Sequence, residues 1–169
     1  MRNQDGVKIL LFVSLLAAPE IGHTQPPADS ATLQIRRITF APWLHVNLFS
    51  SYQTWSGTFV RDLLPGNGLP QGLSSNVRIT LRMWLADGTP IINPAQPSDT
   101  VRFVIGRGAL IRGIEEGVTG MRLGGVRQLV IPSIAGFGPA GRNSVPPNAV
   151  LVAEVALIGA ALGAERVTR

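Results

Sequence analysis

Glu115 and Glu116 are the two side chains whose types and spacing come nearest to acid–base chemistry. A pair of carboxylates can cleave a glycosidic bond when both face the same substrate. Adjacent residues on a helix do not face each other, so this pair lacks the necessary arrangement. We therefore expect Glu115 and Glu116 to lie on a solvated helix face with an arginine nearby.

Metal and nucleophilic chemistry have no better support. The chain has no cysteine, which removes disulfides, thiolate catalysis and cysteine-based zinc sites. His23 and His45, its two histidines, lack HExxH spacing, so we expect no metal site. No GxSxG segment presents a serine nucleophile. Gly106 and Gly108 lack the third glycine of a dinucleotide-binding loop, so we expect no phosphate-binding cofactor there.

Polar residues therefore do not define a catalytic site, and the candidates narrow to binding proteins and enzymes that need no titratable group. The formal net charge is +5, but the arginines are scattered along the chain. Because no platform of aromatic and basic residues accompanies them, we expect no nucleic-acid partner. Hydrophobic residues make up 45% of the chain, which is enough for a packed core.

The elements that would position a site of this kind are mostly strands. Residues 77–85 alternate strictly between apolar and polar side chains, which predicts a half-buried strand. Asp87 and Gly88 then form a tight-turn dipeptide. The prolines in the segment that follows, residues 90–99, exclude a central strand there. Further strands are predicted at residues 58–64, 101–105, 126–132 and 150–158.

Residues 110–118 are the best helix candidate. Ile111, Ile114 and Val118 recur on one helical face, while Gly113 and Gly117 predict that the helix is short. Several strands joined by turns around one short helix predict an α+β domain in which an antiparallel sheet curls over the helix.

The two ends of the chain have a different composition. A basic start and an apolar run of moderate length predict a signal peptide over residues 1–24. If it were not cleaved, this segment would act as a short membrane anchor. Residues 25–32 are predicted to be a loose linker, and residues 33–56 are apolar enough to pack on the domain. We expect residues 160–169 to form a frayed tail.

Residues 106–118, GRGALIRGIEEGV, resemble the G-x-x-x-V-I-x-G-W-x-E-G-[VL] core of the FKBP family of peptidyl-prolyl cis-trans isomerases. Other segments match the family in the same order: WLADGT at residues 84–89, MRLGG at 121–125, and LVIP, FG and VPPNAVLV between 129 and 152. Each motif alone is weak, but the ordered set, from about residue 58 to 158, is specific.

The resemblance implies a half-barrel antiparallel sheet wrapped around one short helix, with a pocket between them. The implied reaction is rotation about an X-Pro peptide bond, whose uncatalysed barrier is roughly 20 kcal/mol. An apolar cavity favours the twisted amide over the planar, charge-separated one, and a backbone N–H near Ile111 would orient the substrate carbonyl. No cofactor is expected, and the partners would be proline-containing polypeptides.

The family's pocket can be transferred onto this chain residue by residue. The implied catalytic residues are Phe103, Ile111 and Phe137. The implied substrate pocket comprises Leu81, Ile92, Val101, Leu110, Ile114 and Ala153.

Several of these positions depart from the family pattern. Leu81 and Ile92 replace a polar tyrosine–aspartate pair, Ala153 replaces a phenylalanine, and Ile114 replaces a tryptophan. Each lost aromatic wall removes roughly 1.5–3 kcal/mol of possible burial, so we expect a looser, more aliphatic pocket. Two hypotheses stay open: an active isomerase of reduced rate, and a binding or chaperone-like module that keeps the fold without catalysis.

The predicted organisation is a signal peptide (1–24), a linker and N-terminal extension (25–57), an FKBP-type domain (58–159) and a C-terminal tail (160–169). The signal predicts an exported protein, with the periplasm as the expected compartment, and no stable membrane span is expected from its short apolar run. The sequence leaves oligomeric state open.

Overall fold

The computed structural model describes residues 30–92 and 100–161, and the side chains of most of them. The predicted signal peptide and most of the predicted tail lie outside this part of the chain. In the described ranges no helix is long and apolar enough to cross a membrane.

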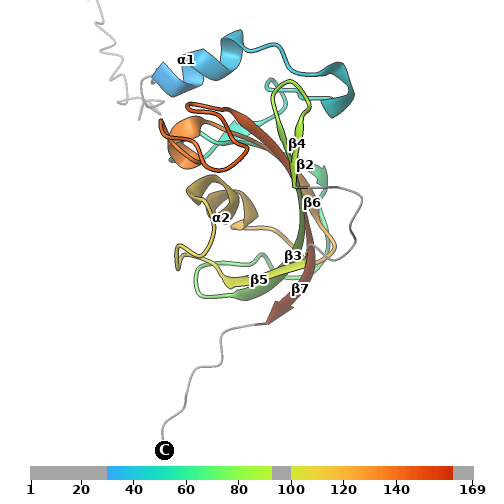
Figure 1. Ribbon diagram of the computed structural model, residues 1–169. Helices are drawn as coiled ribbons and strands as arrows, with labels where there is room; N and C mark the ends of the chain where they lie inside the picture. The colour runs from blue at the N-terminus through green and yellow to red at the C-terminus, as the bar shows by residue number, and fades with distance from the viewer. Residues whose placement is uncertain (1–29, 93–99, 162–169) are drawn as a thin grey trace, which may run out of the picture.

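One antiparallel sheet forms the body of the molecule (Figure 1). Its strands run in the order β1-β2-β6-β7-β3-β4, and β5 pairs with β3 beside β4. The strand bounds are β1 Tyr52–Gln53, β2 Phe59–Leu64, β3 Asn76–Leu85, β4 Pro90–Ile92, β5 Thr100–Val104, β6 Val126–Ile131 and β7 Leu151–Ala161.

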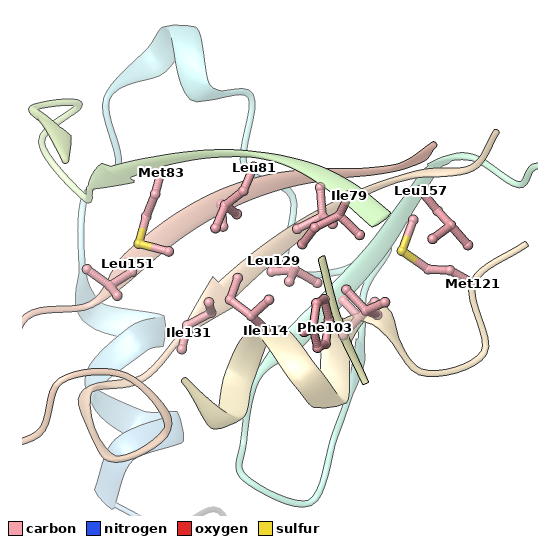
Figure 2. Packing of buried hydrophobic residues seen from close by; sticks show 14 of the residues in the cluster. Ile79, Leu81, Met83, Phe103, Ile114, Met121, Leu129, Ile131, Leu151 and Leu157 are labelled. Atoms are coloured by element: carbon pink, nitrogen blue, oxygen red, sulfur yellow. The ribbon is translucent and has the colours of Figure 1, made fainter. Parts of the chain in front are cut away.

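The concave face of this sheet wraps around helix α2, Arg112–Val118 (Figure 1). The alternation predicted for residues 77–85 is seen in β3, where Val77, Ile79, Leu81 and Met83 are buried on the same face. Figure 2 shows the side chains of Ile79, Leu81 and Met83 on the side of β3 that faces α2. The predicted α+β fold, a curled antiparallel sheet over a short helix, is therefore confirmed.

The convex face is covered by the N-terminal extension. Helix α1, Ser30–Arg37, buries Ile35 against a cluster on β2 and β6, and the short 3-10 helix η1, Pro42–Leu44, buries Leu44 against Trp84 and Val152. Residues 33–56 thus pack on the domain as expected. The loose linker predicted for residues 25–32 is corrected at its end, because α1 begins at Ser30.

The extension also explains why Trp84 is only 9% exposed although it lies on the polar side of the predicted pattern. Its ring meets the edge of Trp43 with centroids 5.7 Å apart. The β3–β4 turn also lies against Trp43, since a Cβ on Gly88 would lie 2.6 Å from the Trp43 ring. One strand can therefore be buried on both faces when a segment from elsewhere covers the outer one.

The C-terminal strand is longer than the pattern predicted. β7 continues to Ala161, and its last residues, Ala160 and Ala161, pair with Val77 and Asn76 of β3. The predicted frayed tail is therefore wrong at residues 160 and 161, where ladder pairing holds weakly apolar residues in place.

Candidate active site

A cavity of about 410 Å³ opens between α2 and the concave face of the sheet. That volume lies within the range of small-molecule binding pockets. Its walls come from β3, β4, the loop before α2 and the loop after the 3-10 helix η2, Ser133–Ala135. The lining residues are Leu81, Met83, Ile91, Gly108, Ala109, Leu110, Ile111, Ile114, Phe137 and Arg142.

Helix α2 lies so close to β6 that only glycine fits at two of its positions. A Cβ on Gly113 would lie 2.9 Å from Thr58 Oγ1 and closer still to Ile131, and one on Gly117 would lie 2.5 Å from Leu129. The glycines that weaken the helix as a local structure are therefore what allows it to approach the sheet. This close approach places Ile114 on the pocket floor.

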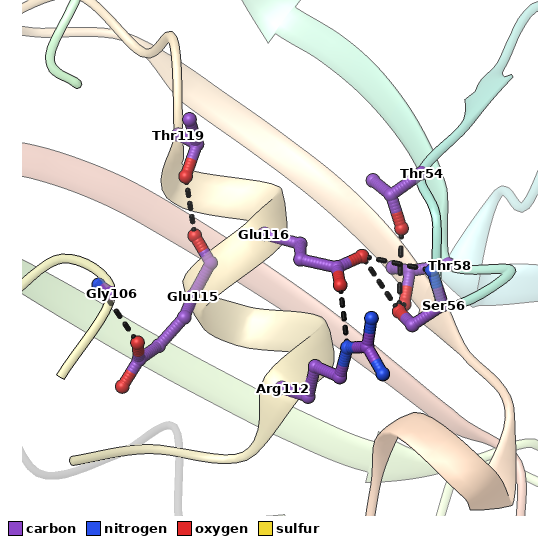
Figure 3. Close-up of polar contacts among 8 residues, drawn as sticks. All are labelled: Thr54, Ser56, Thr58, Gly106, Arg112, Glu115, Glu116 and Thr119. Atoms are coloured by element: carbon purple, nitrogen blue, oxygen red, sulfur yellow. Dashed lines mark hydrogen bonds and ion pairs between the residues drawn. The ribbon is translucent and has the colours of Figure 1, made fainter. Parts of the chain in front are cut away.

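The loop before α2 is held by the carboxylate of Glu115, which is only 8% exposed. The N–H groups of Gly106 and Gly108 donate to its Oε2 at 2.9 and 3.2 Å, and the N–H of Leu110 donates to its Oε1 at 3.0 Å. Figure 3 shows Glu115 reaching back from the helix to this loop. The expected solvated face is wrong for Glu115, because the chain turns back over it and supplies three backbone N–H donors.

Glu116 anchors the opposite side of the helix (Figure 3). Its Oε2 accepts from the N–H and the hydroxyl of Ser56 at 3.0 and 2.8 Å, and its Oε1 accepts from Arg112 Nε at 2.7 Å. Burial raises the pKa of this carboxyl, but hydrogen bonding by Thr54, Ser56 and Arg112 outweighs burial and holds the pKa below its usual range. The arginine that we expected near the two carboxylates is therefore Arg112, which binds Glu116.

The structure brings five of the nine predicted site residues together around the cavity. They are Leu81, Leu110, Ile111, Ile114 and Phe137.

Of the other four predicted residues, three lie outside the cavity lining, and the side chain of the fourth is not among those that the structure describes. Phe103 is a buried core residue beside Ile114 (Figure 2), and half-buried Val101 packs on the same core. Ala153 is fully buried in β7, opposite Met83 and Leu129 in the ladder. Ile92 pairs with Met83 through its backbone, and its side chain lies outside the described parts of the chain.

Five lining residues were not among the predicted ones: Met83, Ile91, Gly108, Ala109 and Arg142. Met83 could have been found, because it shares the inward face of residues 77–85 with Leu81. Ile91 belongs to a three-residue edge strand, and the prolines in and after this strand hid its apolar–polar alternation. Arg142 carries no sequence signal, since only the folding of its loop brings it to the cavity.

Ile111, which lines the cavity, has a backbone N–H without an acceptor among the described residues. Ile111 is the residue before the first turn of α2, with φ −58° and ψ 144°. Its N–H donates no hydrogen bond to any residue in the described ranges. A carbonyl oxygen placed in the cavity near Ile111 can therefore accept from it.

A second hollow, of about 270 Å³, lies on the other side of the loop before α2, between Leu73 and Thr119. Its buried polar group is the Glu115 carboxylate, which already accepts from three backbone N–H groups. A ligand in this hollow would therefore find apolar contacts but no buried polar group that is free to bind it. We assign the candidate active site to the larger of these two cavities.

The sequence and the fold both match one family. The family described as FKBP-type peptidyl-prolyl cis-trans isomerase matches residues 71–158. That range is more than half of the chain and includes α2, the loop before it and the pocket-lining part of β3. The chain belongs to this family.

Individual relatives support the assignment. An FK506-binding protein of Neisseria meningitidis serogroup B is 34% identical over 103 residues, covering 60% of this chain and 94% of that protein. FK506-binding protein 1 of Dictyostelium discoideum is 34% identical over 103 residues, covering 60% and 96%.

Solved structures show the same fold. The crystal structure of FkpA from Escherichia coli has a TM-score of 0.61 and 26% identity, over 68% of this chain and 53% of that one. The crystal structure of AtFKBP13 has a TM-score of 0.58 and 25% identity, over 64% and 97%.

Proposed function

We propose that this protein is an active peptidyl-prolyl cis-trans isomerase, and that it accelerates rotation of X-Pro bonds in the cavity between α2 and β3. The observation that carries the proposal is the cavity itself, a mostly apolar hollow of about 410 Å³ whose described lining residues all lie within the segment that matches the family. A prolyl ring fits such a hollow, and the clients would be proline-containing polypeptides.

The proposed mechanism needs no titratable group. The X-Pro amide is planar because of a resonance that separates charge. Rotation about the C–N bond destroys this resonance and has an uncatalysed barrier of roughly 20 kcal/mol. Side chains such as Ile114 and Phe137 exclude water and offer the charge-separated form little stabilisation, so the twisted form is favoured. The free Ile111 N–H would hold the substrate carbonyl while the bond turns.

The proposal is tested by measuring cis–trans exchange of a proline tetrapeptide by NMR with catalytic amounts of the purified protein. We expect exchange that is faster than in buffer and proportional to protein concentration. An exchange rate that stays at the buffer value with folded protein would contradict the proposal. Heat-inactivated protein is the control for buffer effects.

A second candidate is a binding module that keeps the fold but not the catalysis. It is motivated by the lining, in which Phe137 is the one aromatic residue among those that the structure describes. A module of this kind would bind proline peptides, and their NMR signals would shift, without any increase in exchange rate. The same titration therefore separates the two candidates.

A further inference from the structure

One charged side chain faces the otherwise apolar candidate active site. Among the described residues lining the cavity, nine are apolar side chains or glycine, and the tenth is Arg142. A cation placed at an apolar wall acts on a ligand more strongly than one in open water, because the local dielectric is lower. Among the described lining residues, Arg142 is therefore the one that can select a ligand by charge.

The backbone that carries Arg142 is fixed in place. The Arg142 N–H donates to the Val145 carbonyl at 3.1 Å, and the Val145 N–H donates back to Arg142 at 2.9 Å. Gly141 has a φ of +65° and lies so close to Pro146 that a Cβ there would sit 2.8 Å from its carbonyl carbon. None of these contacts uses the guanidinium group, so the side chain can be replaced without removing them.

The Arg142 guanidinium has no ion-pair partner in the described part of the chain. The carboxylates of the neighbouring helix are already engaged. Glu115 accepts from three backbone N–H groups, and Glu116 binds Arg112 and Ser56. The side chain is exposed at the cavity, and an arginine in this setting matches the planar geometry of a carboxylate.

Resting on the proposed function, we propose that Arg142 makes the protein selective for acidic proline segments, in which a glutamate or aspartate stands next to the proline. The proline ring occupies the apolar cavity, and the neighbouring carboxylate pairs with Arg142. The formal net charge of +5 also draws acidic segments toward the molecule. A glutamine in the same position has a similar shape but cannot form the ion pair.

The test compares tetrapeptides that differ only in Glu or Gln beside the proline, on its N-terminal side in one pair and on its C-terminal side in another. We expect kcat/KM to favour Glu by about threefold in one of the two pairs, as is typical of a partly exposed ion pair, and the preference to fall at high salt. In Arg142→Glu the preference should reverse. The matched control is Arg102→Glu, an equal charge change at an exposed residue on β5, which should keep the preference.

The outcomes separate the selectivity from the activity. Equal kcat/KM for Glu and Gln in both pairs, or a preference unchanged by Arg142→Glu, would overturn the inference while leaving isomerase activity standing. If no peptide is isomerised, the proposed function fails, and calorimetric binding of the same peptides still decides the inference. Tighter binding of Glu peptides that is lost in Arg142→Glu supports it, and equal binding overturns it.

Discussion

Glu115 shows how a single buried carboxylate can shape a site without touching a substrate. Its oxygens accept hydrogen bonds from three backbone N–H groups within residues 106–110, and Gly108, Ala109 and Leu110 of this segment line the cavity. The pattern that suggested acid–base chemistry belongs instead to a structural clamp. Both oxygens accept hydrogen bonds from inside the protein.

Replacing Glu115 should therefore damage both stability and the pocket. In Glu115→Ala, three backbone N–H groups lose their acceptor, and we expect the free energy of unfolding to fall by about 3 kcal/mol. Glu115→Gln keeps one acceptor oxygen and should lose less. Urea unfolding of the two variants measures the difference. Equal, negligible losses in both would show that the loop is held by something other than the carboxylate.

Glu116 should make stability depend on pH. Its pKa is lower in the folded protein than in the unfolded chain, so the unfolded chain binds more protons in acid. The stabilisation is complete above the unfolded pKa and is lost as pH falls through the lower, folded pKa. We expect Glu116→Gln to cost about 1 kcal/mol at neutral pH.

Urea unfolding of the wild type and of Glu116→Gln between about pH 7 and pH 3 measures this dependence. The gap between the two proteins should narrow toward acid pH. A gap that widens toward acid pH would mean that folding raises the pKa of Glu116 rather than lowering it.

At the scale of elements, the docking of α2 on β6 decides the shape of the cavity. Alanine is normally a better helix former than glycine by about 1 kcal/mol. At Gly113 a methyl group would meet Ile131 and Thr58, so we expect Gly113→Ala to destabilise the fold by roughly 1–3 kcal/mol. Thermal unfolding tests this.

Gly72→Ala is the control for Gly113→Ala, because a Cβ there meets nothing within 4 Å. We expect that change to be neutral or slightly stabilising, since it restricts the unfolded chain. If Gly113→Ala were equally harmless, the helix would have room to move away from the sheet.

The same elements show how far a sequence alone can predict this structure. The alternation in residues 77–85 and the helical face of Ile114 and Val118 depend on local period, and both are seen in the structure. The predicted start of the helix was wrong, because α2 begins at Arg112 and Ile111 precedes it with extended backbone angles. The burial of Trp84 and Glu115 was not foreseen, because each is covered by a segment that is remote in sequence or that turns back on itself. Arg142 reaches the cavity only through the fold of its loop.

At the scale of the whole molecule, the sheet separates two apolar layers. The concave layer contains α2 and the cavity, and the convex layer holds the N-terminal extension through Ile35, Leu44 and Trp84. Because the strands lie between the layers, changes in the extension should affect stability without altering the cavity.

Leu44→Ala tests this separation. Leu44 is 5% exposed and packs on Trp84 and Val152, so its truncation should lower the free energy of unfolding by about 2–4 kcal/mol. Isomerase kcat/KM, measured where the variant is fully folded, should equal the wild-type value. A large fall in kcat/KM would mean that the extension shapes the cavity through the sheet.

The central claim is that X-Pro bonds rotate in the cavity between α2 and β3, and a bulky side chain at the entrance of this cavity tests it most directly. Ala109 is exposed and lines the cavity, so Ala109→Trp should block it while leaving the core intact. Ala140→Trp is the control, at an exposed position outside the lining. In the NMR exchange assay we predict that kcat/KM falls by about tenfold or more in Ala109→Trp and stays unchanged in Ala140→Trp. Wild-type activity in a folded Ala109→Trp variant would show that X-Pro bonds are turned somewhere other than this cavity.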